Sequence, residues 1–127
     1  MASPLFDSVE MLTLHVSDFD RAVKFYQDTL GLTPEYVMAD NGFASFPLKN
    51  GSTIGLHRDD CAQIPDGRRP GGATGFYIMC GDVKEKAAEL RKRGVPITEE
   101  KSMPFGDTVA FADPDGNEMV FLQPNQE

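Results

Sequence analysis

The sequence that decides the fold is Phe111-Ala112-Asp113-Pro114-Asp115-Gly116-Asn117-Glu118-Met119-Val120-Phe121-Leu122. Asp115-Gly116 stands between two apolar runs, and an Asp-Gly pair supplies the positive φ angles of a two-residue hairpin turn. Pro114 has no backbone N–H to donate to a sheet, so it belongs outside the paired strands, at the start of the turn. The stretch therefore predicts two antiparallel strands joined by a tight turn.

The same arrangement occurs earlier in the chain, where Asn50-Gly51 lies between the apolar runs 46–48 and 53–56. A helical pattern precedes each turn, and each helix has an aspartate at its start and a glycine at its end. These landmarks recur at nearly constant offsets, which are 64 residues from Asp18 to Asp82, 63 from Gly31 to Gly94 and 65 from Gly51 to Gly116. The agreement predicts an internal repeat of one supersecondary unit.

Each copy of the repeat is expected to be a βαβββ module. Module one spans about 9–58, a connector covers 59–72, and module two spans about 73–124 of a single domain, 1–127. In module one we predict a helix at 19–30 and strands at 11–16, 35–39, 43–48 and 53–58. In module two we predict a helix from 83 that ends at Gly94, strands at 75–80, 96–98, 107–112 and 118–123, and a loop at 103–106. Because each helix can cover only one face of its sheet, we expect an α+β fold in which two modules form a curved sheet around a cleft.

The composition is that of an ordinary soluble, globular domain. The 127 residues include 12 basic and 20 acidic side chains, for a net charge of −8. Nucleic-acid binding depends on clustered Lys and Arg, so we expect no nucleic-acid partner. The N-terminus has no basic flank and no long apolar run, so we expect neither a signal peptide nor a membrane span. Cys61 and Cys80 have neither metal-site spacing nor the density of a disulfide framework, which favours a cytoplasmic location.

Strand alternation predicts which side chains face the cleft. In the first strand of each module, the set expected under the helix is Leu12, Leu14, Val16, Phe76, Ile78 and Cys80. The opposite faces of the first and last strands carry Met11, Thr13, His15, Gly75, Tyr77, Met79, Thr53, Gly55, His57, Glu118, Val120 and Leu122. The ionisable members of this set are His15, His57 and Glu118.

Two imidazoles and one carboxylate form a donor set for zinc or, as a facial triad, for iron. His15, His57 and Glu118 lie on separate strands, so they meet around one ion only if the register brings each within about 2 Å of it. The alternative is a structural role for each: His57 would pair with a surface carboxylate, His15 would be a hydrogen-bonded, partly buried imidazole, and Glu118 would be solvated beside the turn. Phe105, which precedes a glycine in a loop, could be a lid over the cleft or could pack on the surface.

Two motifs resemble those of a known superfamily. Residues 14–26 read LHVSDFDRAVKFY and lead to LGL at 30–32, and residues 111–117 read FADPDGN. In these motifs the chain resembles the vicinal oxygen chelate superfamily, which includes glyoxalase I, extradiol dioxygenases, fosfomycin-resistance enzymes and the bleomycin-binding proteins. The match covers nearly the whole chain and is specific for the fold, whereas the superfamily contains different chemistries and proteins that are not enzymes.

The resemblance also implies where a metal would be bound. Enzymes of the superfamily hold a divalent metal with His or Glu on the first and last strand of each module, and those positions here are Met11, Gly55, Gly75 and Val120. None of the four has a carboxylate or an imidazole. His15 lies four residues beyond the first of these positions. The resemblance therefore favours a member that uses no cofactor.

We expect a binding protein that encloses an aromatic or cationic small molecule in the cleft without a metal. Aromatic and apolar side chains would contact the ligand, a carboxylate would neutralise a cation and a histidine would hydrogen-bond. The expected contacts are His15, Phe46, His57, Tyr77, Met79, Phe105, Glu118 and Val120. The alternative is a lyase or dioxygenase with a displaced Zn, Ni, Mn or Fe site at His15, His57 and Glu118, or with a histidine as metal-free general base. The resemblance also implies a homodimer, whose modules pair within or between chains.

Overall fold

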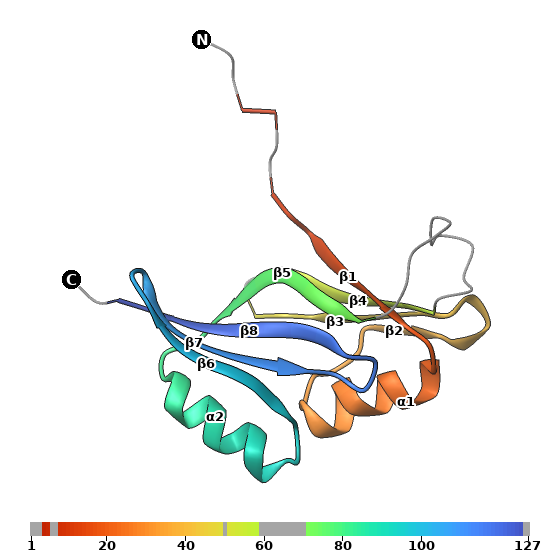
Figure 1. Cartoon of the computed structure of the whole chain (residues 1–127). Coiled ribbons are helices and arrows are strands. Elements are labelled where there is room, and N and C mark those ends of the chain that lie inside the picture. Colours follow the sequence, from red (N-terminus) through yellow and green to blue (C-terminus); the bar gives the residue numbers. More distant parts are fainter. Residues whose placement is uncertain (1–3, 6–7, 50, 59–70, 126–127) are drawn as a thin grey trace. The chain divides into compact units, whose positions relative to one another are not determined.

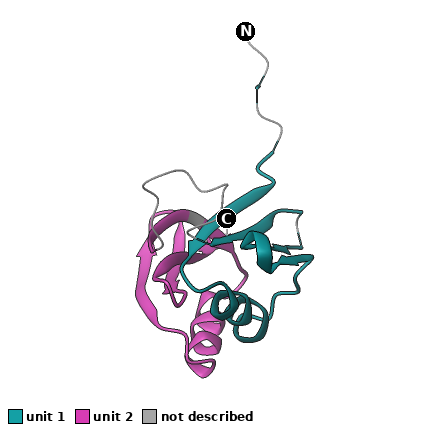
Figure 2. Ribbon diagram, turned by 90° about the vertical axis from the view of Figure 1, so that its right-hand side faces the viewer, with its two compact units in different colours: residues 1–68 teal, residues 69–127 magenta. Residues whose placement is uncertain are grey.

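The computed structural model describes residues 4–5, 8–49, 51–58 and 71–125. The chain divides into two compact units, residues 1–68 and 69–127, which Figure 2 colours separately. The expected connector 59–72 lies outside the described residues except for Gly71 and Gly72, and so do Asn50 of the first predicted turn and Cys61.

The first unit is a four-stranded sheet with one helix (Figure 1). Its elements are β1 (Met11–Val16), α1 (Phe19–Lys24), the π-helical turn η1 (Phe25–Thr29), β2 (Tyr36–Met38), the 3-10 turn η2 (Ala39–Asn41), β3 (Phe43–Pro47) and β4 (Thr53–Arg58). The strand order is β1-β4-β3-β2, with β1 parallel to β4 and the other neighbours antiparallel.

The second unit has the same order of elements. It contains β5 (Gly72–Met79), α2 (Val83–Lys92), β6 (Ile97–Met103), β7 (Gly106–Ala112) and β8 (Asn117–Pro124). Its strands lie in the order β5-β8-β7-β6, with β5 parallel to β8. The α+β class and the βαβββ order of each unit are therefore confirmed, whereas the cleft between the modules stays a prediction.

Both helices begin where the sequence predicts. Asp18 accepts a hydrogen bond from the Arg21 backbone N–H at 3.1 Å, and the Asp82 side chain accepts from two backbone N–H groups of the first turn of α2. Gly31 and Gly94, which follow the two helices, have φ angles of 78° and 75°. The predicted single helix at 19–30 is in fact an α-helical segment that continues as the wider turns of η1.

The predicted two-residue hairpin turn is wrong in its detail. The residues between β7 and β8 are 113–116, and Asp113 organises them: its Oδ1 accepts from the backbone N–H groups of Asp115 at 2.9 Å and Asn117 at 2.8 Å. Among the described residues, positive φ angles occur only at glycines, and Gly116 has 82°. The turn lies one residue earlier than expected: the Gly116 N–H donates to the Asp113 carbonyl oxygen at 2.9 Å across Pro114-Asp115, and the Asp113 carboxylate adds its bonds to the loop N–H groups.

The strand predicted at 96–98 is also too short, since β6 runs from Ile97 to Met103. Its middle residues are Glu99, Glu100, Lys101 and Ser102, all of which are exposed. β6 is an edge strand of the second sheet, where charged residues are common and apolar alternation is weak. The predicted loop at 103–106 therefore shrinks to a turn at 104–105.

Each helix packs against one face of its own sheet. In the first unit the ring of Tyr26 in η1 lies 6.0 Å from that of Phe46, and Leu14, Val16, Ile54 and Leu56 are buried. In the second unit the Lys86 amine of α2 lies 5.9 Å from the centre of the Phe121 ring, which stacks on Phe111. Each sheet therefore has a helix-covered face and an opposite face, which we call the open face. No helix among the described residues is long and apolar enough to span a membrane.

Candidate functional site

The open face of the first unit brings the two histidines together. His15 on β1 is paired in register with His57 on β4, and their ring centres are 6.3 Å apart. Phe43 on β3 is paired with His57 on the other side, and its ring meets the imidazole edge to face at 5.1 Å. The row therefore carries two imidazoles and a phenyl ring on adjacent strands.

The surroundings of His57 favour its neutral form. Burial lowers the pKa of His57 below the usual 6.5, and the positive charge of His15 lowers it further. A neutral imidazole has one ring nitrogen that donates a hydrogen bond and one that accepts. Near neutral pH, His57 can therefore donate to or accept from a polar group without carrying a charge.

The open face of the second unit carries large exposed apolar side chains. Tyr77 is 52 % exposed, Met79 is 64 % exposed and Phe105, in the turn after β6, is 46 % exposed. The rings of Tyr77 and Phe105 meet at 6.1 Å in an edge-to-face arrangement. Val120 on β8 is paired with Tyr77. These four side chains provide an aromatic and apolar surface of the kind that binds a flat ligand.

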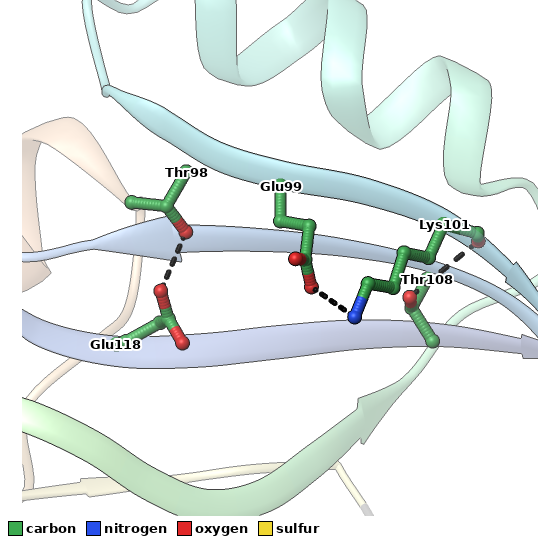
Figure 3. A network of polar contacts seen from close by, with 5 residues as sticks. All are labelled: Thr98, Glu99, Lys101, Thr108 and Glu118. Carbon is green, nitrogen blue, oxygen red and sulfur yellow. Dashed lines mark hydrogen bonds and ion pairs between the residues drawn. The ribbon is translucent and has the colours of Figure 1, made fainter.

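Polar side chains on β6, β7 and β8 form a row in the second sheet (Figure 3). The Thr98 hydroxyl donates to Glu118 Oε2 at 2.7 Å, the Lys101 amine lies 3.2 Å from Glu99 Oε1, and the Thr108 hydroxyl donates to the Lys101 carbonyl oxygen at 3.5 Å. The Glu118 carboxylate, which was expected to be solvated in the structural alternative, is held in one orientation by Thr98. Its charge can therefore be directed at a ligand.

Sequence reasoning missed Thr98. The pairing of β6 with β7 shifts register between Ile97 and Glu99, so Thr98 is an extra residue in the ladder. This bulge lets the Thr98 side chain reach Glu118, two strands away in the sheet order. A bulge has no reliable signature in a single sequence. The strand predicted at 96–98 ends at Thr98, so it does not include Glu99, where the regular pairing with β7 resumes.

Phe46, one of the expected ligand contacts, lies on the wrong face. It is paired with Ile54, is fully buried and packs against Tyr26 on the helix side of the first sheet. The even-numbered residues of β3 and β4 are paired with one another and lie on the helix side of the sheet, so Phe46 lies there too. Phe46 is therefore a core residue and is not available to a ligand on the open face.

The four positions at which the resemblance implies a metal do not fit one. A Cβ built on Gly55 would lie 2.8 Å from Met11 Sδ, so the thioether of Met11 fills the space of a side chain at 55. Gly75 has a φ of 83° within the irregular part of β5, and Val120 is half-buried. Divalent Zn, Ni, Mn and Fe need carboxylate, imidazole or thiolate donors, which these four residues lack.

The displaced site at His15, His57 and Glu118 stays a proposal. The two histidines are neighbours in the first unit, and Glu118 belongs to the second. Among the residues that the structure describes, no three His, Cys, Asp or Glu side chains are grouped so that they could hold a metal ion.

The comparisons with known proteins agree with the fold. Residues 8–121 match the Glyoxalase/Bleomycin resistance protein/Dioxygenase superfamily. A member of this superfamily from Sphaerobacter thermophilus is 30 % identical, with a TM-score of 0.79 over 94 % of this chain and 98 % of that one. TnmS3, an antibiotic binding protein from a Streptomyces species, is 25 % identical, with a TM-score of 0.81 over 97 % of this chain and 100 % of that one. The virulence protein STM3117 of Salmonella typhimurium is 26 % identical over 120 residues, which are 89 % of this chain and 81 % of that protein. The chain belongs to the glyoxalase/bleomycin resistance protein/dioxygenase superfamily.

Proposed function

We propose that the protein binds small aromatic, cationic molecules on the open face of each of its sheets, without a metal. The observation that carries this proposal is the exposed set Tyr77, Met79 and Phe105 in a sheet that also holds the oriented carboxylate of Glu118. Exposed apolar clusters rimmed by polar groups are typical of ligand-binding surfaces.

The aromatic part of the ligand is supported by the shape of the second open face. The ring planes of Tyr77 and Phe105 meet at 66°, and Met79 adds a flexible thioether. Such side chains bind flat rings by stacking and by sulfur contacts. A purely polar metabolite would leave this surface without a partner.

The cationic part is supported by charge. Glu118 lies two residues before Val120, the residue paired with Tyr77, and therefore on the same face of β8 as Val120. The Thr98 hydroxyl donates to one carboxylate oxygen, which fixes the orientation of the negative charge. A net charge of −8 adds a favourable field for a positively charged ligand.

The first open face contributes hydrogen-bonding groups. His57, whose pKa is lowered by burial and by His15, offers a neutral imidazole beside the Phe43 ring. Among the relatives, TnmS3 is an antibiotic binding protein, which supports a binding function for this chain. His15 and His57 are therefore proposed as polar contacts, and Tyr77, Met79, Phe105, Glu118 and Val120 as the aromatic and charged surface.

The test is a titration with proflavine, a fluorescent planar aromatic cation. The chain contains no tryptophan, so the dye supplies the signal. We expect saturable binding and a rise in melting temperature of several degrees at a dye concentration about a hundredfold above the dissociation constant. Tyr77→Ala should weaken binding, and Val9→Ala, which shortens an exposed apolar side chain before β1, is the control. Absence of binding by proflavine and by other aromatic cations would refute the proposal.

A second candidate function is favoured by the pairing of His15 with His57. Two adjacent imidazoles, one of them held neutral, could act in a displaced metal site with Glu118 or as a general base. The test is metal analysis of protein purified without an affinity tag. One equivalent of divalent metal that is lost in His15→Ala and in Glu118→Ala would establish this candidate and reject metal-free binding. No metal in the wild-type protein would reject the displaced site.

A further inference from the structure

The hydroxyl of Ser45 is a buried polar group that the fold does not use. Ser45 lies in β3, a central strand of the first sheet, and is 2 % exposed. Its Oγ has no hydrogen-bond partner among the described residues, whereas its backbone carbonyl accepts from the Glu35 N–H at 2.8 Å. A buried hydroxyl without a partner is unfavourable, because folding removes its hydrogen bonds to water. Among the described side chains of the first sheet, Ser45 Oγ is thus a buried polar atom that lacks a hydrogen-bond partner, which a ligand could supply.

The place of Ser45 in the sheet is the centre of the open face. The row across the four strands consists of Thr13, Gly55, Ser45 and Tyr36, each paired with the next. Gly55 has no side chain, and the Met11 thioether fills the space above it, with Sδ 2.8 Å from a Cβ built there. Met11 is the first residue of β1 and is 41 % exposed. The space over Gly55, next to Ser45, is therefore occupied by the unbranched, flexible side chain of Met11.

The second unit provides an internal comparison. Its strands β7 and β8 have the places of β3 and β4, and the pair equivalent to Ser45 and Gly55 is Ala110 and Val120. Ala110 is buried, and no hydroxyl is present at this position of the second sheet. The same topology is therefore built with an apolar pair, and packing does not require the hydroxyl of Ser45.

We propose that Ser45 Oγ is the hydrogen-bonding anchor for the polar edge of an aromatic ligand, which reaches it by displacing the Met11 side chain from Gly55. This inference rests on the proposed function and adds the chemical class of the ligand, an aromatic ring with an amino or hydroxyl group at its edge. The ring itself would lie toward Tyr36, which is paired with Ser45 and is exposed, and toward the adjacent row of His57 and Phe43. A ring-edge N–H or O–H donates to Ser45 Oγ and so satisfies the buried oxygen.

The test compares two dyes with the same tricyclic ring system and the same charge. Proflavine carries ring amino groups that donate hydrogen bonds, and in acridine orange these groups are dimethylated and cannot donate. We expect wild-type protein to prefer proflavine and Ser45→Ala to reduce that preference about 5-fold to 10-fold, with the affinity for acridine orange nearly unchanged. Ser102→Ala, which removes an exposed hydroxyl of the second unit, is the matched control and should leave the preference unchanged. Met11→Ala should tighten the binding of both dyes, because no side chain has to be displaced.

Two readouts separate this inference from the proposed function. If neither dye binds the wild-type protein, the proposed function and this inference both fail. If both dyes bind and Ser45→Ala retains the wild-type preference, this inference alone is overturned. Without any ligand, Ser45→Ala should raise the melting temperature by about 2–6 °C and the reciprocal Ala110→Ser should lower it, since each changes one unpartnered hydroxyl. A lower melting temperature for Ser45→Ala would show a structural role for the hydroxyl and would overturn the inference.

Discussion

Replacing Glu118 by glutamine should weaken the binding of a cationic ligand and leave the site's shape intact. The Thr98 hydroxyl donates to Glu118 Oε2 at 2.7 Å, and it can donate equally to the amide oxygen of a glutamine. The substitution therefore removes the charge and keeps the hydrogen bond that orients the side chain.

The magnitude follows from distance and exposure. Two unit charges about 4 Å apart attract by about 4 kcal/mol at an effective dielectric constant of about 20. Glu118 is only half-buried, so water screens part of this attraction, and about 1–2 kcal/mol remains. We therefore expect the Kd of proflavine to rise about 5-fold to 30-fold in Glu118→Gln.

The assay is a fluorescence titration at low and at high salt. The control is Glu100→Gln, which makes the same change of net charge on the helix side of β6, where Glu100 Oε2 lies 2.7 Å from Arg91 Nη2. The control should change the Kd less than about twofold, and the effect of Glu118→Gln should shrink at high salt. Equal effects of the two substitutions would show that only the overall charge matters and that Glu118 does not contact the ligand.

Three further predictions concern the framework of the site. Phe46→Ala should lower the free energy of unfolding by about 3–5 kcal/mol in urea denaturation and Phe105→Ala by less than about 1 kcal/mol, since Phe46 is fully buried and Phe105 is 46 % exposed; similar losses would contradict the assignment of faces. The pKa of His57 is lowered in the folded state, so the unfolded chain binds a proton at this imidazole more readily than the folded chain does. The stability that His57 contributes is complete above the unfolded pKa of about 6.5 and is lost as the pH falls through the folded pKa. His57→Gln should therefore flatten the fall of the urea midpoint between pH 7.5 and pH 5, and an unchanged slope would count against it. Asp113→Ala should cost about 2–4 kcal/mol in the same assay, because the buried carboxylate accepts bonds from the loop N–H groups and from Asn117 Nδ2 at 2.8 Å; a loss below about 0.5 kcal/mol would show that the loop is held in another way.

The sequence predicts the framework well where local chemistry acts alone. Asp18 and Asp82 begin the helices as expected, because a capping carboxylate bonds N–H groups only a few residues away. Strand alternation correctly separates buried Leu14 and Val16 from exposed Met11 and Thr13.

The prediction fails where the outcome depends on pairing across strands. The place of Phe46 follows from its register with Ile54, and the role of Thr98 follows from a bulge against β7. The unpartnered hydroxyl of Ser45 likewise becomes visible only when its neighbours are known, since a serine in a strand is ordinary in sequence. The loop at Asp113 lies between these cases, because Asp115-Gly116 predicts a turn here, but the bonds of the Asp113 side chain cannot be predicted from that pair.

A proflavine titration of protein treated with EDTA distinguishes metal-free binding of an aromatic cation from binding that needs a metal. Metal-free binding predicts saturable binding with the same Kd before and after EDTA treatment, and no gain when Zn, Ni, Mn or Fe is added back. Binding that disappears with EDTA and returns with one equivalent of a divalent metal would contradict it.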